Sequence, residues 1–109
     1  MALPHAIPDQ VLEVRTLGEN LLTGKTAARF ESQDLEVMRL VLHAGKALPP
    51  HKVPGEITIH CLEGVLGVEV DGSTSQLEAG ELVFLAGGAS HSVMALTDAS
   101  ALVTIALRQ

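Results

Sequence analysis

Histidine is the residue type in this sequence best suited to chemistry, and it occurs at positions 5, 43, 51, 60 and 91. A neutral imidazole serves as a general base near physiological pH and is the commonest protein ligand for metals. His51 and His91 each lie in a glycine-marked segment, residues 45–64 and 80–95. If the fold brings these two distant rings face to face, they can bind a metal ion or orient a small molecule. His51 and His91 are therefore the principal predicted site residues.

Two nearby side chains would complete a metal site under specific conditions. Glu56 follows the turn at residues 54–55 and supplies a carboxylate if that turn bends it inward; otherwise it is a solvated turn residue. His60 offers a third imidazole, but successive side chains on a strand point to opposite faces. If residues 57, 59 and 61 point into the interior of the fold, His60 points away from it. A bulge at Thr58 would reverse this alternation and turn His60 inward.

The elements that must position these residues are predicted to be β-strands. Short apolar runs alternate with turn-forming residues, which is the pattern of an all-β domain. Asp71-Gly72 is the strongest hairpin signal, whereas the two prolines within residues 45–50 interrupt the strand pattern. The predicted strands cover residues 27–31, 35–43, 57–62, 65–70, 74–77, 81–85, 91–96 and 101–107.

The N-terminal part of the chain is ambiguous. The apolar residues within 10–22 fit either a short strand with a turn at Gly18 or a frayed helix. We expect residues 1–24 to form an arm that packs on the barrel or on a partner subunit, and residues 25–109 to form the barrel itself.

The glycine and histidine spacing over roughly residues 37–107 resembles that of the cupin superfamily. The positions that fall in register with its two motifs are Gly45, His51 and Gly64 in the first, and Gly80, Gly88 and His91 in the second. The resemblance implies a small single-domain cupin of the RmlC-like type, whose fold is a double-stranded β-helix, or jelly-roll barrel. It also implies a homodimer, because small cupins usually pair through N-terminal strands.

The departures from the cupin motifs fall on the metal ligands. Val53 occupies the position of the second histidine, and Ile57 or Thr58 occupies that of the glutamate. The terminal asparagine of the second motif is replaced by Ala95, and its proline by Ala86. The resemblance implies a divalent transition metal (Fe, Mn, Ni or Zn) bound by His51 and His91, or a degenerate site that has lost it, since catalytic metal sites commonly use three or more protein ligands.

Three interpretations of function follow. In the first, the chain is a metal-dependent enzyme acting on a small molecule in a lumen lined by Val53, Ile57, Phe84 and Val93. In the second, it is a non-catalytic cupin that binds or senses a small-molecule ligand, with the two histidines as hydrogen-bonding groups. In the third, the barrel is packed solid by its own side chains and serves as a structural dimer module.

Composition narrows the possible partners and location. The 109 residues suit one domain, and a net charge of −6 with scattered basic residues, no Trp and no Tyr argues against nucleic acid. No apolar run is long enough to cross a bilayer, and residues 1–10 lack the pattern of a signal peptide. A single cysteine, Cys61, is typical of a reducing cytoplasm. The positive mean hydropathy favours a subunit interface, so we expect a homodimer.

Overall fold

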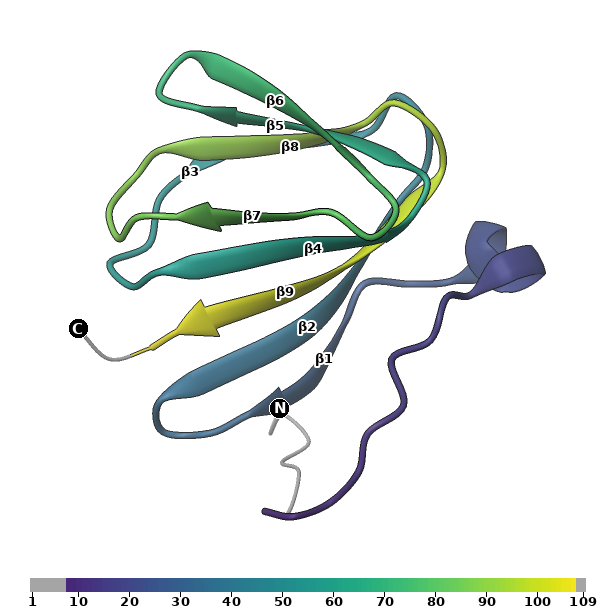
Figure 1. Cartoon of the computed structure of the whole chain (residues 1–109), viewed down its shortest axis with the longest axis horizontal. Helices are drawn as coiled ribbons and strands as arrows, with labels where there is room; N and C mark the ends of the chain where they lie inside the picture. Colours follow the sequence, from purple (N-terminus) through teal and green to yellow (C-terminus); the bar gives the residue numbers. More distant parts are fainter. Residues whose placement is uncertain (1–7, 108–109) are drawn as a thin grey trace.

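Two antiparallel β-sheets facing one another make up the chain in a computed structural model that describes residues 8–107 (Figure 1). The five-stranded sheet has the order β1-β2-β9-β4-β7, and the four-stranded sheet has the order β3-β8-β5-β6. The strands are β1 (Ala27–Glu31), β2 (Leu35–Leu42), β3 (Ala47–His51), β4 (Ile57–Glu63), β5 (Val65–Val70), β6 (Ser73–Glu78), β7 (Leu82–Leu85), β8 (His91–Ala95) and β9 (Ala99–Ala106). The predicted all-β jelly roll is confirmed.

Alternation of side chains along the strands builds the core between the sheets. Along β4, Ile57, Ile59 and Cys61 are buried while Thr58 and His60 are only half-buried. β8 follows the same pattern, with His91, Val93 and Ala95 buried. Because strand residues two apart share a face, these residues line the interior from both sheets. β9 pairs with β2 on one side and β4 on the other, so it is the central strand of the five-stranded sheet.

The predicted hairpin at Asp71-Gly72 joins β5 to β6 in an unbroken register. Both turn residues have positive φ, 48° at Asp71 and 90° at Gly72, as the tight turns that suit the twist of a two-stranded ribbon require. This turn fixes the register of β5, which in turn pairs with β8.

The prediction that residues 45–50 interrupt the strand pattern is wrong, because β3 (Ala47–His51) runs through both prolines. β3 is an edge strand and pairs only with β8. A proline has no N–H to donate, and an edge position needs no donor on its open side. The ladder also shifts between Leu48 and His51, so Pro49 and Pro50 occupy a bulge.

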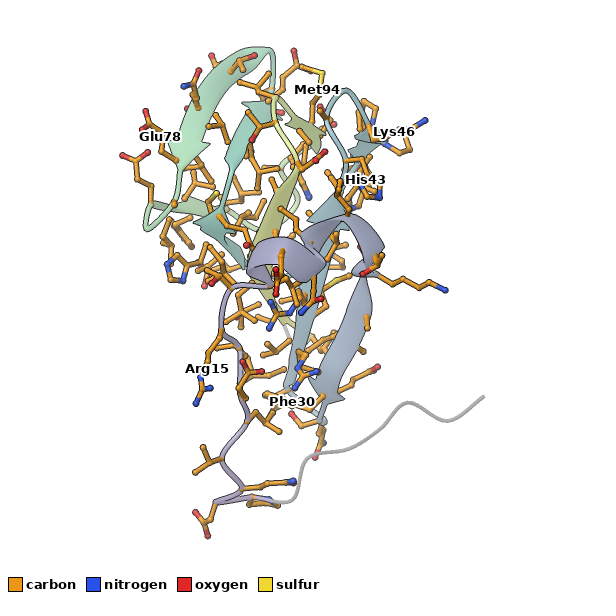
Figure 2. All side chains as sticks on the ribbon, turned by 90° about the vertical axis from the view of Figure 1, so that its right-hand side faces the viewer. Arg15, Phe30, His43, Lys46, Glu78 and Met94 are labelled. Carbon is orange, nitrogen blue, oxygen red and sulfur yellow. The ribbon has the colours of Figure 1, made fainter. Side chains whose placement is uncertain are left out.

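The ambiguous N-terminal segment contains one short helical element, the 3₁₀ helix η1 (Gly18–Thr23). Before η1 the chain is extended, and side chains of the barrel donate hydrogen bonds to the backbone carbonyl groups of this segment. The Arg39 guanidinium donates to the carbonyl of Arg15 over 2.6 Å, while Figure 2 shows the side chain of Arg15 pointing away from the strands. Residues 1–7 of the predicted arm and residues 108–109 of the predicted barrel lie outside the described residues. Within residues 8–107, no helix is long and apolar enough to span a membrane.

Candidate functional site

A cavity of about 70 Å³ lies between the two sheets. Among the described residues, His51 and His91 are the only polar ones in its wall. The other lining residues are aliphatic side chains and one thioether, namely Met38, Leu40, Leu48, Ile57, Ile59, Val93, Val103 and Ile105. The cavity is therefore an apolar space with one polar corner, as binding sites for small molecules commonly are.

The polar corner forms because β3 and β8 pair with His51 directly opposite His91. The two ring centroids are 4.4 Å apart, and the ring planes are tilted by 53°. Leu48 and His51 are three residues apart, so on a regular strand they would point to opposite faces. The bulge at Pro49 and Pro50 restores the parity and places both Leu48 and His51 in the cavity wall.

The two histidines differ in exposure. His91 is only 4% exposed, whereas His51 is an exposed residue at the same corner. The polar corner thus has an exposed side at His51 and a buried side at His91. A molecule in the cavity that contacts His91 does so in a desolvated setting, where an unsatisfied polar group is costly.

Each ring is held by a hydrogen bond to the backbone carbonyl two residues earlier in the chain. The His51 Nδ1 lies 3.2 Å from the carbonyl oxygen of Pro49, and the His91 Nδ1 lies 3.2 Å from that of Ala89. A carbonyl oxygen only accepts, so in the neutral ring Nδ1 carries the hydrogen and Nε2 carries a lone pair. Neither Nε2 has a hydrogen-bond partner among residues 8–107. The corner therefore presents two unoccupied acceptors.

The structure does not bring the two other predicted ligands to this corner. From Ile57 to Cys61 the pairing of β4 with β9 is regular, and its bulge lies after Cys61 rather than at Thr58. His60 therefore faces outward, beside Leu82 of β7. Glu56 is exposed in the loop before β4. His43, seen at the end of β2 in Figure 2, lies 3.9 Å from Asp98 and is not in the cavity wall.

The donor set does not fit a resident transition metal. No group of three His, Cys, Asp or Glu side chains within residues 8–107 is placed to hold a metal ion. The two imidazoles of His51 and His91 are one ligand short of the three that catalytic zinc sites use, and no carboxylate joins them.

Two of the four residues predicted to line the lumen do so. Ile57 and Val93 are in the cavity wall. Val53 instead lines a separate depression at the barrel mouth with Lys52, because it lies beyond the end of β3. Phe84 is 58% exposed, since the pairing of β7 with β4 turns it to the outer face of the sheet, so the prediction for Phe84 is wrong.

Sequence reasoning missed most of the aliphatic wall, which β2, β3, β4 and β9 provide. These residues are Met38, Leu40, Leu48, Ile59, Val103 and Ile105. A signal was present in the strands themselves, since Met38 and Leu40, like Val103 and Ile105, are two apart and share a face. The sequence alone did not show which face of each strand points into the cavity.

Two titratable groups outside the cavity have pKa values that differ from their ordinary ones. Burial raises the pKa of the Cys61 thiol, which donates weakly to the carbonyl of Gly64. Burial also acts to raise the pKa of Glu63, but it is outweighed by hydrogen bonds from the Leu17 amide, the Ser100 hydroxyl and the Gly18 amide, so the pKa is lowered. Glu63 thus ties the N-terminal segment to the end of β4.

Comparison with known proteins agrees with this architecture. The family model described as "Cupin domain" matches residues 38–107. Among solved structures, the conserved SPY1581 protein of unknown function from Streptococcus pyogenes is similar over 100% of this chain and 97% of its own, with 18% identity and a TM-score of 0.76. An RmlC-like cupin protein from Desulfovibrio desulfuricans is 26% identical over 94% of this chain and 98% of its own, with a TM-score of 0.71.

A third similar structure is a cupin superfamily protein from Desulfitobacterium hafniense, which is 12% identical with a TM-score of 0.75 and covers 99% of this chain and 100% of its own. A search among curated proteins finds no match. These likenesses establish the fold, and none of them carries a reaction over to this chain.

Proposed function

This chain belongs to the cupin domain family, and from that premise we propose that it binds a small, largely apolar molecule in the lumen of its barrel. The observation that carries the proposal is the cavity itself, an apolar space with a single polar corner at His51 and His91. The aliphatic wall would supply affinity through burial of apolar surface, and the two imidazoles would orient the ligand.

The size of the cavity limits the ligand. Pockets for drug-sized molecules enclose roughly 300–1,000 Å³, and this one encloses about 70 Å³. An engineered cavity of about 150 Å³ accommodates benzene. This cavity has about half that volume, so the proposed ligand is a compact aliphatic molecule of about three to four non-hydrogen atoms. Its affinity is expected in the millimolar to micromolar range, because so few atoms limit the binding free energy.

A methyl NMR titration tests this proposal. The probes are aliphatic molecules of four non-hydrogen atoms that differ only in their polar group, namely 2-propanol, acetone and the hydrocarbon isobutane. Saturable shifts at the methyl groups of Ile57, Ile59 and Val103, with no change at the outward-facing Leu82, are the expected result. If no probe shifts the cavity methyls, the lumen does not bind ligands of this size and the proposal fails.

Metal-dependent chemistry is the second candidate function, and one observation favours it. The Nδ1 bonds of His51 and His91 hold the tautomer whose Nε2 can bind a metal. The missing third ligand counts against it. Element analysis of protein purified without a polyhistidine tag decides between the two. A stoichiometric metal that is lost in both His51→Ala and His91→Ala would favour this second function.

The proposal includes a homodimer in the cytoplasm. Leu82 and Phe84, 55% and 58% exposed, are two residues apart on the edge strand β7 and share the outer face of the five-stranded sheet. Exposed apolar side chains of this size support a contact with another subunit. The buried free thiol of Cys61 fits a reducing compartment.

A further inference from the structure

We propose that the lumen selects a ligand with a neutral hydroxyl group, and that it discriminates against carbonyl compounds, carboxylates and ammonium ions of the same size. This inference rests on the proposed binding function and names the chemical class of the ligand. It follows from which hydrogen-bonding groups line the cavity and which are absent from it.

The two histidines offer acceptors only. Their Nδ1 hydrogens are directed to the carbonyl oxygens of Pro49 and Ala89, at 3.2 Å each, so each neutral ring has only the Nε2 lone pair to offer a ligand. A ketone or ester oxygen also carries only lone pairs and gains no hydrogen bond at this corner. A hydroxyl group donates its hydrogen to an Nε2 and satisfies it.

The rest of the wall disfavours charged ligands. None of the eight other lining residues carries a charge or a hydrogen-bonding group. An ammonium ion would lose its hydration shell without a carboxylate to replace it, and a carboxylate would face two lone pairs. An ion that is buried without a partner carries a large desolvation penalty. A neutral hydroxyl donates a hydrogen bond without this penalty.

The two rings are not equivalent in this role. A hydroxyl has one hydrogen to donate, so His51 and His91 compete for it. His51 is exposed, and water can satisfy its Nε2. His91 is 4% exposed, and a ligand that fills the cavity excludes water from it. We therefore assign the hydroxyl contact to His91, with His51 at the mouth.

The test compares 2-propanol with acetone, which have the same carbon skeleton and number of non-hydrogen atoms. Dissociation constants are measured by methyl NMR at mildly alkaline pH for the wild-type protein, with sodium acetate and isopropylamine, also of four non-hydrogen atoms, as charged probes. The alcohol is expected to bind about tenfold more tightly than the ketone, as one buried hydrogen bond made or left unmade implies. Neither charged probe should bind measurably.

The variant arm uses His91→Leu, with His60→Leu on the outer face as the matched control. The alcohol-to-ketone preference should fall to about one in His91→Leu and stay unchanged in His60→Leu. If the wild-type protein binds the ketone or acetate as tightly as the alcohol, the hydroxyl inference is overturned while luminal binding stands. If neither 2-propanol nor acetone nor isobutane shifts the cavity methyls, luminal binding fails as well. The wild-type comparison decides the question even if His91→Leu does not fold.

Discussion

At the scale of single residues, His51 and His91 make the same local hydrogen bond but differ in their exposure to solvent. His51 and His91 both bond through Nδ1 to the carbonyl two residues earlier, yet one ring is exposed and the other is buried. Glycine and histidine spacing was sufficient to predict this pair. It was not sufficient to place Val53 or Phe84, because their directions depend on a bulge and on a pairing register that no local pattern encodes.

Cys61 yields a prediction about reactivity. Its side chain is 0% exposed and burial raises the pKa of the thiol, so the reactive thiolate is scarce and inaccessible. We expect no labelling of native protein by N-ethylmaleimide at neutral pH over a time in which a free thiol reacts fully, and stoichiometric labelling in denaturant. Labelling of the native protein at the rate of a free thiol would show that β4 opens readily.

Glu63 yields a prediction about pH. Its pKa is lowered in the folded state, so its hydrogen bonds stabilise the fold fully above the unfolded pKa and are lost as the pH falls through the lower folded value. Glu63→Gln should reduce the free energy of unfolding at neutral pH by about 1–2 kcal/mol, with a weaker dependence on pH in the acid range. Urea denaturation across that range measures both effects.

The exposed carboxylate of Glu56 provides the control for this prediction. Glu56→Gln should change stability by less than about 0.5 kcal/mol, as surface substitutions usually do. Equal effects of the two substitutions would mean that the contacts of Glu63 with Leu17, Gly18 and Ser100 add no net stability.

At the scale of elements, β3 shows where local sequence patterns are not sufficient to predict a strand. Two prolines normally argue against a strand, and the sequence prediction followed that rule. The strand forms because β3 is at an edge, where the ladder tolerates a missing donor, and the bulge then turns His51 inward. The strand Val65–Val70, which ends at the Asp71-Gly72 turn signal, was predicted to the residue. Elements that depend on their place in the sheet were not predictable, since that place is decided by distant strands.

The turn between β4 and β5 offers a second test at this scale. Gly64 has a φ of 77°, and a Cβ there would lie 2.1 Å from the carbonyl oxygen of Asp98. Gly72 also has positive φ, but a Cβ there would meet nothing within 4 Å. Gly72→Ala should cost about 1–2 kcal/mol through backbone strain, and Gly64→Ala at least about 2 kcal/mol more through the clash. Thermal unfolding of both variants measures the difference, and equal costs would contradict the tight packing of this turn.

At the scale of the whole molecule, the two faces of the five-stranded sheet have separate roles. Its inner face closes the cavity through Ile57, Ile59 and Val103. Its outer face presents Leu82 and Phe84 at the β7 edge. The jelly roll itself was predictable because turn signals and motif spacing recur along the chain. The division of one sheet into a face that lines the cavity and a face that exposes Leu82 and Phe84 was not, because it requires the packed structure.

The proposed dimer contact can be tested by replacing the exposed apolar side chains of Leu82 and Phe84 with polar ones. Leu82→Ser combined with Phe84→Ser should shift the protein to monomer, because both side chains lose the apolar surface that association would bury. Sedimentation velocity over a dilution series measures the change. Met94→Ser, on the outer face of the other sheet, is the control and should leave association unchanged. A wild-type protein that is monomeric at micromolar concentration would contradict the dimer.

The central claim is that a small molecule occupies the space between the sheets and contacts the two imidazoles. The most direct measurement is the set of intermolecular NOEs from the protons of bound 2-propanol. We expect NOEs to the methyl groups of Ile59 and Val103 and to the ring protons of His51 and His91. NOEs confined to Leu82 and Phe84 on the outer face, or the absence of any NOE at saturating alcohol, would contradict the claim.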